Sequence, residues 1–363
     1  MIEPFIRSIM QSIRSNGDAV PRFAEHPLCE ERAFLLDVLR MLSLIESEYT
    51  TEELARISLI IRRFRPLDSL VCQLTDGYIR KLVPDYHWGM LHDVQRNDAY
   101  KTAIQNCITP NSIVLDVGCG AGLLSIMAAR AGAGHVYACE SNGALAAVAE
   151  QNIERAGFSS RVSVINKRAE ELRLGADLPS KCNVLLHELF AGNLVGEGVL
   201  RILDSINAEL LTDDAVHLPN RFCVRIQGVR DPALIKAHRV STVDDIDLSA
   251  LNVLAPSVSR QVSIKHGVMI GRAQTAVEYS IVANRVSGNC GKRIRIPQLW
   301  RRGIVGFIQW ISFTFPDGTT YENIPGTASH WKWRFYPIEH NTSTEFRFVV
   351  GEVIGDRLLL YLE

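Results

Sequence analysis

A glycine-rich loop after a short apolar run restricts the architecture of this chain more than any other stretch of its sequence. Residues 114–122 read VLDVGCGAG. Glycine tolerates a left-handed backbone and lets other groups approach the main chain closely, so this run predicts a strand that turns sharply into a helix. Comparable apolar runs at 135–139, 162–165 and 183–186 alternate with helical patterns such as 143–156. This alternation predicts a parallel, doubly wound sheet with a ligand site at the carboxyl ends of its strands.

The segments on either side of this region have different patterns. In the first 84 residues, apolar residues recur at helical spacing, and Thr50 with Glu53 predicts a capping box at the start of a helix that Pro66 ends. After Pro219, runs rich in aromatic and β-branched residues predict antiparallel strands in a barrel or a sandwich. These runs are 221–229, 275–283, 305–315, 330–336, 345–353 and 357–362. We therefore expect an N-terminal helical domain at 1–84, a Rossmann-like α/β domain at 85–218 and a β domain at 219–363.

Composition and charge exclude several classes of protein. Of the 363 residues, 47% are hydrophobic and 22% are charged, which is typical of a folded globular chain. Lysine and arginine number 39 against 40 aspartate and glutamate residues, so we expect no nucleic-acid partner. No apolar run approaches the roughly 18 residues of a membrane span, and Glu3 and Arg7 interrupt any signal-peptide pattern. The eight cysteines stand singly, so we expect reduced thiols, no metal site and a cytoplasmic location.

Three details of the glycine loop indicate its ligand. Leu123 stands where a dinucleotide fingerprint has its third glycine, and no lysine follows as in a phosphate-binding loop. Asp116 ends the first strand, where it can meet an ammonium group, and Glu140 ends the second, where it can accept from two ribose hydroxyls. S-adenosylmethionine combines an adenosyl group with a cationic amino-acid end and fits this pattern; the alternative is a glycine turn without a ligand. The loop glycines that would line this site are Gly118, Gly120 and Gly122.

Two glutamates, Glu188 and Glu197, stand nine positions apart after the fourth strand of the predicted sheet. The loop between them contains Gly192 and Gly196, so the two carboxylates could fold back toward each other beside the cofactor. An equally weighted alternative places Glu197 at the start of the following helix, where acidic residues are favoured by the helix dipole. The spacing alone does not separate these two interpretations.

Six motifs have an order and spacing that match one family. They are MLHDVQRN at 90–97, the VLDVGCGAG loop, Glu140, RAEE at 168–171, the glutamate pair and SHW at 329–331. Over roughly residues 85–363 the chain resembles the protein arginine methyltransferase family, and within it the branch that makes monomethylarginine. The resemblance implies an α/β plus β fold: a Rossmann-like class I methyltransferase domain followed by an antiparallel β-barrel. It also implies that arginine is held between the two.

The resemblance implies cofactor contacts for four residues. Arg96 would pair with the carboxylate of S-adenosylmethionine, a bidentate contact that suits a guanidinium. Glu140 would hold the ribose, and Ala169 with Glu170 would hold the adenine edge. These roles add to those that the residues of the glycine loop suggest by themselves.

The resemblance also places Glu188 and Glu197 on the substrate guanidinium, with one terminal nitrogen aimed at the methyl group. Because the pKa of a guanidinium exceeds about 12, a base that deprotonates it beforehand is not credible. The carboxylates would instead act by orientation and by holding charge. Asp93 and His330 would form a neighbouring pair that either relays the late proton or locks the two domains together, and both interpretations carry equal weight.

Two further residues would line the substrate site. Met90 would pack against the methyl and sulfonium groups, although ordinary core packing is a serious alternative, and Trp331 would contact the substrate. The chain departs from the family at Val199, where several members have methionine, which bears on the product type. The segment 230–274, where the family carries a dimerisation arm, looks short, so the N-terminal helical block could instead form a homodimer or wall the site.

We therefore expect an S-adenosylmethionine-dependent arginine N-methyltransferase of the EC 2.1.1 class. Free L-arginine is slightly favoured, because the chain lacks tails for recruiting protein targets, and monomethylation is expected. Lys332 and Arg334 beside Trp331 could receive a free α-carboxylate, although a solvated strand face is the more ordinary interpretation. The alternative is a protein arginine N-methyltransferase, and a lesser one is a non-catalytic interaction protein of the same fold.

Overall fold

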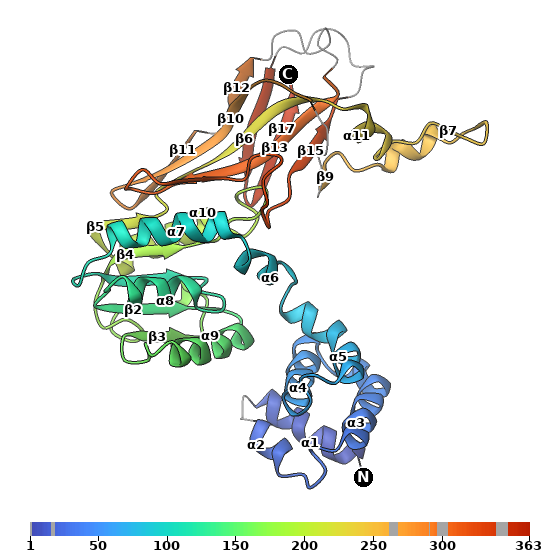
Figure 1. The fold of residues 1–363 in the computed structure, drawn as a ribbon, viewed down its shortest axis with the longest axis vertical. Helices are drawn as coiled ribbons and strands as arrows, with labels where there is room; N and C mark the ends of the chain where they lie inside the picture. Colours follow the sequence, from blue (N-terminus) through green and yellow to red (C-terminus); the bar gives the residue numbers. More distant parts are fainter. Residues whose placement is uncertain (1, 16–18, 261–267, 290, 296–303, 339–347) are drawn as a thin grey trace. The chain divides into compact units, whose positions relative to one another are not determined.

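The computed structural model describes residues 2–15, 19–260, 268–289, 291–295, 304–338 and 348–363. By its internal contacts the chain divides into two compact units, Met1–Trp88 and Gly89–Glu363. Figure 1 shows helices in the first unit, and a sheet with covering helices joined to a set of long strands in the second. The helix α6 (Tyr86–Leu91) crosses the boundary between the units. The three domains expected from the sequence remain a prediction.

The first unit is helical, as its apolar spacing predicts. Its helices are α1 (Ile2–Arg14), α2 (Ala19–Ala24), α3 (Arg32–Ile45), α4 (Thr51–Phe64) and α5 (Ser69–Leu82), with a short 3-10 helix η1 (Glu46–Glu48). Their apolar faces form one core that includes Ile6, Ile9, Leu39, Leu42 and Ile61. The predicted capping box is confirmed, because Thr50 and Glu53 each bond the other's backbone N–H. The helix α4 ends at Phe64, two residues before Pro66, since a residue before proline avoids the helical conformation.

A parallel sheet forms the first part of the second unit. Its strands are β1 (Ile113–Val117), β2 (His135–Cys139), β3 (Val162–Ile165), β4 (Cys182–His187) and β5 (Leu211–Leu218). The order is β3-β2-β1-β4-β5, and every pairing is parallel. The four strands expected from apolar runs are confirmed, whereas β5 carries polar Asp213 and Asp214 and was not singled out. The strand order reverses between β1 and β4, which is where ligands bind in such sheets.

Helices cover this sheet and carry part of its site. They are α7 (Val94–Cys107), α8 (Leu123–Arg130), α9 (Gly143–Arg155), α10 (Val199–Leu210) and the 3-10 helix η2 (Ala169–Glu171). Each of α8 and α9 follows a β-strand within a few residues, which is the βαβ connection predicted from the sequence.

Antiparallel strands form the rest of the second unit. The larger sheet has the order β11-β10-β6-β13-β15-β9, with β14 beside β13, and a smaller sheet has the order β12-β16-β17. The main strands are β6 (Arg221–Arg230), β10 (Val268–Val282), β13 (Gly306–Thr314) and β15 (Arg334–Pro337), with β16 (Phe348–Ile354) and β17 (Arg357–Leu362) in the smaller sheet. The shorter strands are β9 (Ser259–Arg260), β11 (Arg285–Asn289), β12 (Lys292–Arg295) and β14 (Thr320–Glu322). This is the expected β-barrel region, although residues 345–347 of one predicted strand lie outside the described residues.

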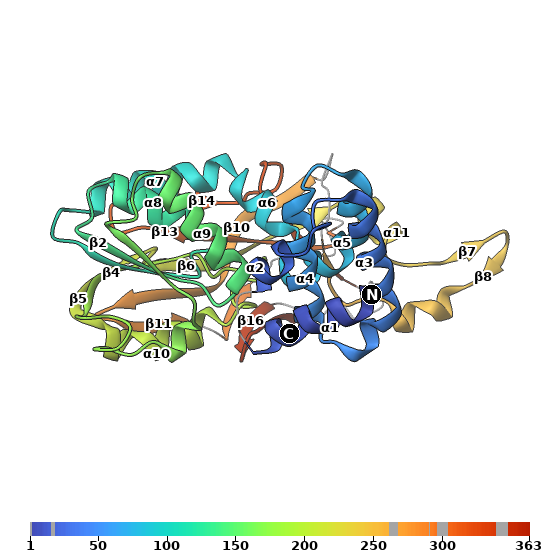
Figure 2. The same cartoon turned by 90° about the horizontal axis from the view of Figure 1, so that it is seen from below.

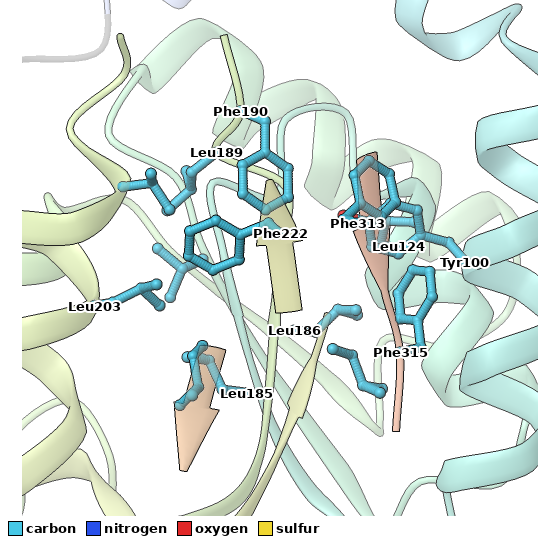
Figure 3. Packing of buried hydrophobic residues seen from close by; sticks show 14 of the residues in the cluster. Tyr100, Leu124, Leu185, Leu186, Leu189, Phe190, Leu203, Phe222, Phe313 and Phe315 are labelled. Atoms are coloured by element: carbon cyan, nitrogen blue, oxygen red, sulfur yellow. The ribbon is translucent and has the colours of Figure 1, made fainter. Parts of the chain in front are cut away.

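An aromatic layer joins the parallel sheet to the β-barrel region. Figure 3 shows Tyr100 of α7, Phe190 after β4, and Phe222 and Phe313 of the barrel packed together with apolar side chains of β4. The rings of Phe190 and Phe313 stack with centroids 5.4 Å apart, and Phe190 lies 5.1 Å from Phe222. A shared aromatic core of this kind fixes the two parts against each other, because buried rings contribute both area and specific geometry.

A segment between β6 and β9 projects from the barrel, and we call residues 231–258 the arm. It contains α11 (Pro232–Lys236), a hairpin of β7 (Thr242–Val243) and β8 (Ile246–Asp247), and the 3-10 helix η3 (Ser249–Leu254). In Figures 1 and 2 the arm extends away from the strands of its own unit. Its Val253 and Leu254 are 87% and 78% exposed.

Among the helices in the described part of the chain, none combines the length and apolar character that crossing a membrane demands. The cysteines are free at the seven described positions, and Cys290 lies outside the described residues.

Candidate active site

The glycine loop turns between β1 and α8 as the sequence predicts. Gly118, Gly120 and Gly122 all have positive φ, and Gly118 has a second constraint. A Cβ there would lie 2.7 Å from a methyl carbon of Leu189, in the loop after β4. The loop after β1 and the loop after β4 therefore pack directly on each other at the carboxyl edge of the sheet.

Asp116 is buried at the end of β1. Its Oδ2 accepts a hydrogen bond from the Ser125 hydroxyl, while its Oδ1 is buried without a partner among the described residues. Burial and, to a smaller extent, the nearby Glu140 carboxylate raise the pKa of Asp116 to about 7, against the opposing effects of Ser125 and Arg96. An ammonium group beside Oδ1 would supply the missing donor and favour the charged carboxylate.

Glu140 follows β2 and is held in place by backbone donors. Its Oε2 accepts from the N–H of Gly120 at 2.9 Å, and its Oε1 accepts from the N–H of Asn142 at 2.8 Å. Each carboxylate oxygen can accept more than one hydrogen bond, so two ligand hydroxyls could still bind. The strand end and the glycine loop thus orient this carboxylate before a ligand arrives.

Arg96 lies one turn into α7 and is only 2% exposed. Its Nη2 donates to Oε2 of Glu188 at 2.8 Å, and its Nη1 donates to the side chain of Asn97. The guanidinium carbon lies 5.1 Å from the ring centroid of Tyr100, one turn further along α7. Its Nε has no hydrogen-bond partner among the described residues. Arg96 is thus a buried cation with one counter-ion and one donor left over.

These residues fit S-adenosylmethionine. The unpartnered Nε of Arg96 matches a carboxylate, and the unpartnered Oδ1 of Asp116 matches an ammonium group, which are the two charged groups of its amino-acid end. The two groups lie close enough that the charge of Arg96 lowers the pKa of Asp116. Glu140, at the end of the neighbouring strand, matches a ribose.

Glu188 and Glu197 are brought into one neighbourhood. Burial and, after it, the charges of Glu188 and Glu140 raise the pKa of Glu197 to about 7. The residue is nevertheless accessible to solvent, so its carboxyl is crowded by protein atoms but reachable. Glu197 lies just before α10, as the alternative interpretation expects, and it also faces the other two carboxylates. The two interpretations of this residue are therefore compatible.

Asp93 joins α7 to the barrel. It is the N-cap of α7, and its Oδ1 accepts from the N–H of Arg96 at 3.0 Å. Its Oδ2 accepts from Nδ1 of His330 at 3.0 Å, from the N–H of His330 at 3.1 Å and from the hydroxyl of Tyr321 at 3.0 Å. Burial alone would raise the pKa of Asp93, but these hydrogen bonds lower it to about 2.

Trp331 and Met90 lie at the edges of this arrangement. Trp331 is 6% exposed, and its indole N–H donates to the carbonyl of Phe190 at 2.6 Å. It therefore supports the loop that carries Glu188 and packs among aromatic side chains. Met90 is half-buried, and its carbonyl accepts from the N–H of Asp93 at 3.2 Å.

Ala169 and Glu170 form η2, next to α10. Ala169 is buried, and a carboxylate oxygen of Glu170 accepts from Arg201 of α10 and, at 3.5 Å, from Arg168. The predicted adenine contact would therefore involve a carboxylate that already has cationic partners.

Three residues that shape the site were not among those predicted from the sequence. Tyr100 stacks on Arg96 and donates its hydroxyl to the carbonyl of His187 at 2.8 Å. The i, i+4 spacing from Arg96 was a usable signal for it. Tyr321 bonds Asp93, and the fully buried Gln309 donates to the carbonyl of Gly192 at 2.8 Å. The sequence contains no signal for either, because each reaches its partner only through the tertiary fold.

Comparisons with known proteins agree with this fold. The family model "Ribosomal protein L11 methyltransferase (PrmA)" matches residues 101–211. An arginine N(omega)-methyltransferase of Streptomyces achromogenes subsp. streptozoticus is 30% identical over 283 residues, 77% of this chain and 77% of that protein. Protein arginine N-methyltransferase 7 of Drosophila erecta is 37% identical over 164 residues, 44% of this chain but 24% of the fly protein, so the match spans about a quarter of it.

A solved structure shows the same fold. The Trypanosoma brucei PRMT1 enzyme-prozyme heterotetrameric complex with AdoHcy superposes with a TM-score of 0.62 at 20% sequence identity, covering 77% of this chain and 93% of that one.

A parallel sheet with a glycine loop, a buried Arg96–Glu188 ion pair and an attached β-barrel defines a Rossmann-like class I methyltransferase. The match to the Streptomyces enzyme, at 30% identity over 77% of both chains, identifies the family within this class. The chain belongs to the protein arginine methyltransferase family.

Proposed function

We propose that this protein transfers one methyl group to a terminal guanidino nitrogen of free L-arginine. Membership of the family makes it an S-adenosylmethionine-dependent arginine N-methyltransferase, and the proposal specifies the form of arginine and the number of methyl groups. The observation that carries the proposal is electrostatic: besides burial, the charges of Glu188 and Glu140 raise the pKa of Glu197, so the three carboxylates lie within electrostatic reach of one another. A permanently charged guanidinium would relieve this repulsion.

Two considerations support free arginine as the substrate. The Streptomyces relative, named for arginine and not for protein arginine, matches over 77% of both chains. The fly protein arginine N-methyltransferase 7 matches over 24% of its own length. The single methyl group follows from the sequence resemblance to the monomethylating branch, and Val199, directly after the Glu197 loop, is fully buried.

Each charged residue would have a distinct task. Arg96, Asp116 and Glu140 would hold S-adenosylmethionine, with Gly118, Gly120 and Gly122 against it and Ala169 and Glu170 at the adenine edge. The bound cofactor supplies an electrophilic methyl group. Glu188 and Glu197 would each accept hydrogen bonds from the guanidinium, which fixes the reacting nitrogen and holds the positive charge on the remaining nitrogens.

Asp93 and His330 would position the site and can also hold a proton. Because Nδ1 of His330 lies 3.0 Å from Oδ2 of Asp93, it donates to that carboxylate, and Nε2 of the neutral ring is then an acceptor. Nε2 is the atom that would take a proton from the product guanidinium. Trp331 would act through the loop it supports, and Met90 would pack beside the reacting groups.

Mass spectrometry of two parallel reactions tests the proposal. The enzyme is incubated with S-adenosylmethionine and either free L-arginine or a peptide rich in Arg-Gly. We expect free arginine to gain the mass of one methyl group and the peptide to remain unchanged. A methylated peptide with unchanged arginine would contradict the proposed substrate, and a second methyl group would contradict monomethylation.

Glu188→Gln tests the site itself. Glutamine keeps an oxygen for Arg96 but removes the charge that holds the substrate, so we expect turnover to fall by at least a hundredfold, which corresponds to about 2.7 kcal/mol. Cofactor affinity should remain within a few-fold in a calorimetric titration. The matched control is Glu154→Gln on the exposed face of α9, which should leave turnover unchanged. An active Glu188→Gln variant would contradict the role of this carboxylate.

We also propose that the protein is a cytoplasmic homodimer and that the arm forms the interface. The arm exposes Val243, Ile246, Leu251, Val253 and Leu254, a concentration of apolar surface on a projecting segment that a second copy could cover. This assigns the interface to the arm and not to the N-terminal helical block. Light scattering should show a dimer that becomes a monomer on Val253→Asp with Leu254→Asp. A dimer that persists in this variant would return the N-terminal block to consideration.

A further inference from the structure

One polar side chain of the barrel is buried against the loop between the two glutamates. Gln309 of β13 has no exposed surface, and its Nε2 donates to the carbonyl of Gly192 at 2.8 Å. Its Oε1 is also buried and has no hydrogen-bond partner among the described residues. Buried amide oxygens are nearly always paired, so this one suggests an acceptor that a ligand completes.

A cation lies beside the same loop. Arg334 of β15 is half-buried and stands directly opposite Gln309 in the antiparallel pairing of β13 and β15. Residues paired in this way have side chains on the same face of the sheet, within about 5.5 Å at Cβ. The alternating neighbours of Gln309 on this face, Phe307 and Ile311, belong to the core shared with the parallel sheet. Arg334 therefore points toward the methyltransferase part and not to the outer surface.

Gly192 lies directly beside the guanidinium of Arg334. A Cβ at Gly192 would lie 3.7 Å from Nε and 3.9 Å from Nη2 of Arg334, and 3.4 Å from the carbonyl oxygen of Lys332. These are ordinary contact distances, and Gly192 is absent from the residues with positive φ, so neither sterics nor the backbone conformation requires glycine. The guanidinium of Arg334 therefore lies against the backbone of the loop that joins the two glutamates.

The loop between the two glutamates has negative charges at its ends and a positive charge beside its middle. Glu188 and Glu197 lie at its ends, and Arg334 lies at its middle, four residues from Glu188. Four residues span at most about 14 Å. Free arginine is likewise charged at both ends, with a guanidinium at one end and an α-carboxylate and α-ammonium at the other. A half-buried guanidinium repels the first end and binds the carboxylate bidentately.

From this arrangement we propose a head-group subsite for a free α-amino acid. Arg334 binds the α-carboxylate of L-arginine, and Oε1 of Gln309 accepts from its α-ammonium group. The inference rests on the proposed function and deepens it, because it names the residues that select free arginine over arginine within a chain. A peptide substrate has neither charged group at this position, and its carbonyl oxygen would gain less from Arg334 than a carboxylate does.

The experiment compares kcat/KM for three small substrates in the full-length enzyme. L-arginine has both charged groups, Nα-acetyl-L-arginine keeps the carboxylate and loses the ammonium, and agmatine keeps the ammonium and lacks the carboxylate. We expect L-arginine to exceed agmatine by about 10- to 100-fold, the range of a lost charged hydrogen bond. Nα-acetyl-L-arginine should fall between them.

Two variants change the subsite in independent ways. Arg334→Gln should lower kcat/KM for L-arginine by about 10- to 100-fold and leave agmatine within about threefold, which removes the preference. Gly192→Asp places a carboxylate beside Arg334 and should give the same selective loss without removing the cation. Arg221→Gln, an exposed cation in β6 of the same sheet, is the matched control and should change neither substrate. Thermal unfolding checks that each variant is folded.

The outcomes separate this inference from the proposed function. Equal kcat/KM for L-arginine and agmatine in the wild type would overturn the subsite and leave arginine methylation standing. An equal loss for both substrates in Arg334→Gln and Gly192→Asp would show a structural role and would also overturn it. A preference for the peptide would overturn the subsite together with the free substrate. No methylation of any arginine compound would overturn the proposed function and this inference with it.

Discussion

Arg96 connects the two halves of the proposed site through a single side chain. Its guanidinium binds Glu188, which would hold the substrate, and retains a donor at Nε for the cofactor. The ring of Tyr100 covers one face of it and excludes water. Because the pair is almost fully buried, the hydrogen bond between the two side chains offsets part of the cost of removing both from water.

Glu197 should give the protein a pH-dependent stability. Its pKa in the folded protein is raised to about 7 from an ordinary value of 4.5, so the charged form is disfavoured by folding. The stability that this group contributes is complete below its unfolded pKa and is lost as the pH rises through about 7. We therefore expect the melting temperature of Glu197→Gln to equal that of the wild type at a pH near the ordinary pKa of 4.5, and to be higher than that of the wild type above pH 7.

Differential scanning fluorimetry of the ligand-free protein between pH 5 and pH 8, a range of about three units around the shifted pKa, measures this difference. Glu154→Gln, exposed on α9, serves as the control and should show no pH-dependent change relative to the wild type. A difference between Glu197→Gln and the wild type that stays constant across the range would contradict the raised pKa.

The helix α7 transmits the position of the barrel to the cofactor site. Its N-cap, Asp93, bonds the first turn of the helix on one side and His330 and Tyr321 on the other. Arg96 lies within that first turn, so its orientation depends on the capping interaction. One carboxylate therefore fixes the helix, the barrel loop and, through the helix, the buried cation.

Asp93→Asn should destabilise the second unit. The amide removes the charge and cannot accept from all the donors that converge on Oδ2, so buried donors lose their partner. We expect the free energy of unfolding at pH 7 to fall by about 3–5 kcal/mol. Because the pKa of Asp93 is lowered to about 2, the wild-type advantage is present above an ordinary aspartate pKa of 3.8 and is lost as the pH falls from there toward 2.

Urea denaturation followed by tryptophan fluorescence measures this change. Asp98→Asn, an exposed aspartate on the same helix, is the matched control and should change stability by less than about 0.5 kcal/mol. Equal stabilities of the two variants would show that Asp93 does not hold the elements together.

At the scale of the whole molecule, the two units have separate apolar cores. The helical unit buries its own apolar cluster, and the second unit buries a much larger one shared by the parallel sheet and the barrel. The aromatic layer in Figure 3 joins the latter two parts through shared packing. Because the first unit has its own core, we expect it to unfold independently of the second unit.

Leu42→Ala should shift only one of two thermal transitions. Leu42 is fully buried in α3, and removing its side chain costs about 2–5 kcal/mol in a core. Differential scanning calorimetry should show the transition of the helical unit at a lower temperature and the other transition unchanged. Leu44→Ala, in the same helix but 76% exposed, is the control and should shift neither. A single transition that moves as a whole would show that the units unfold together.

The elements were largely predictable because their signals are local. The helical spacing of α1 and α3, the capping box of α4 and the apolar runs of β1 to β4 each depend on residues within one turn or one strand. The strand β5 escaped prediction because Asp213 and Asp214 interrupt its apolar pattern, and pairing with β4 decides its conformation. A local sequence pattern does not predict a strand whose conformation depends on pairing with a neighbouring strand.

The sequence by itself determined the parallel sheet, the glycine loop and the chemical character of the site. The residue types at the strand ends, Asp116 and Glu140, indicated an adenosyl ligand with a charged amino-acid end before any contact was known. The glycines follow from the turn that the backbone must make there, and a turn is a local property.

Only the tertiary structure decided which charges meet. Arg96 and Glu188 are 92 positions apart, and no local pattern predicts that they form a buried pair. The same holds for Gln309 at the loop of Gly192, and for the burial and the neighbouring carboxylates that raise the pKa of Glu197. The physical reason is that a charge or a hydrogen bond acts through distance and burial, and both are set by packing and not by order along the chain.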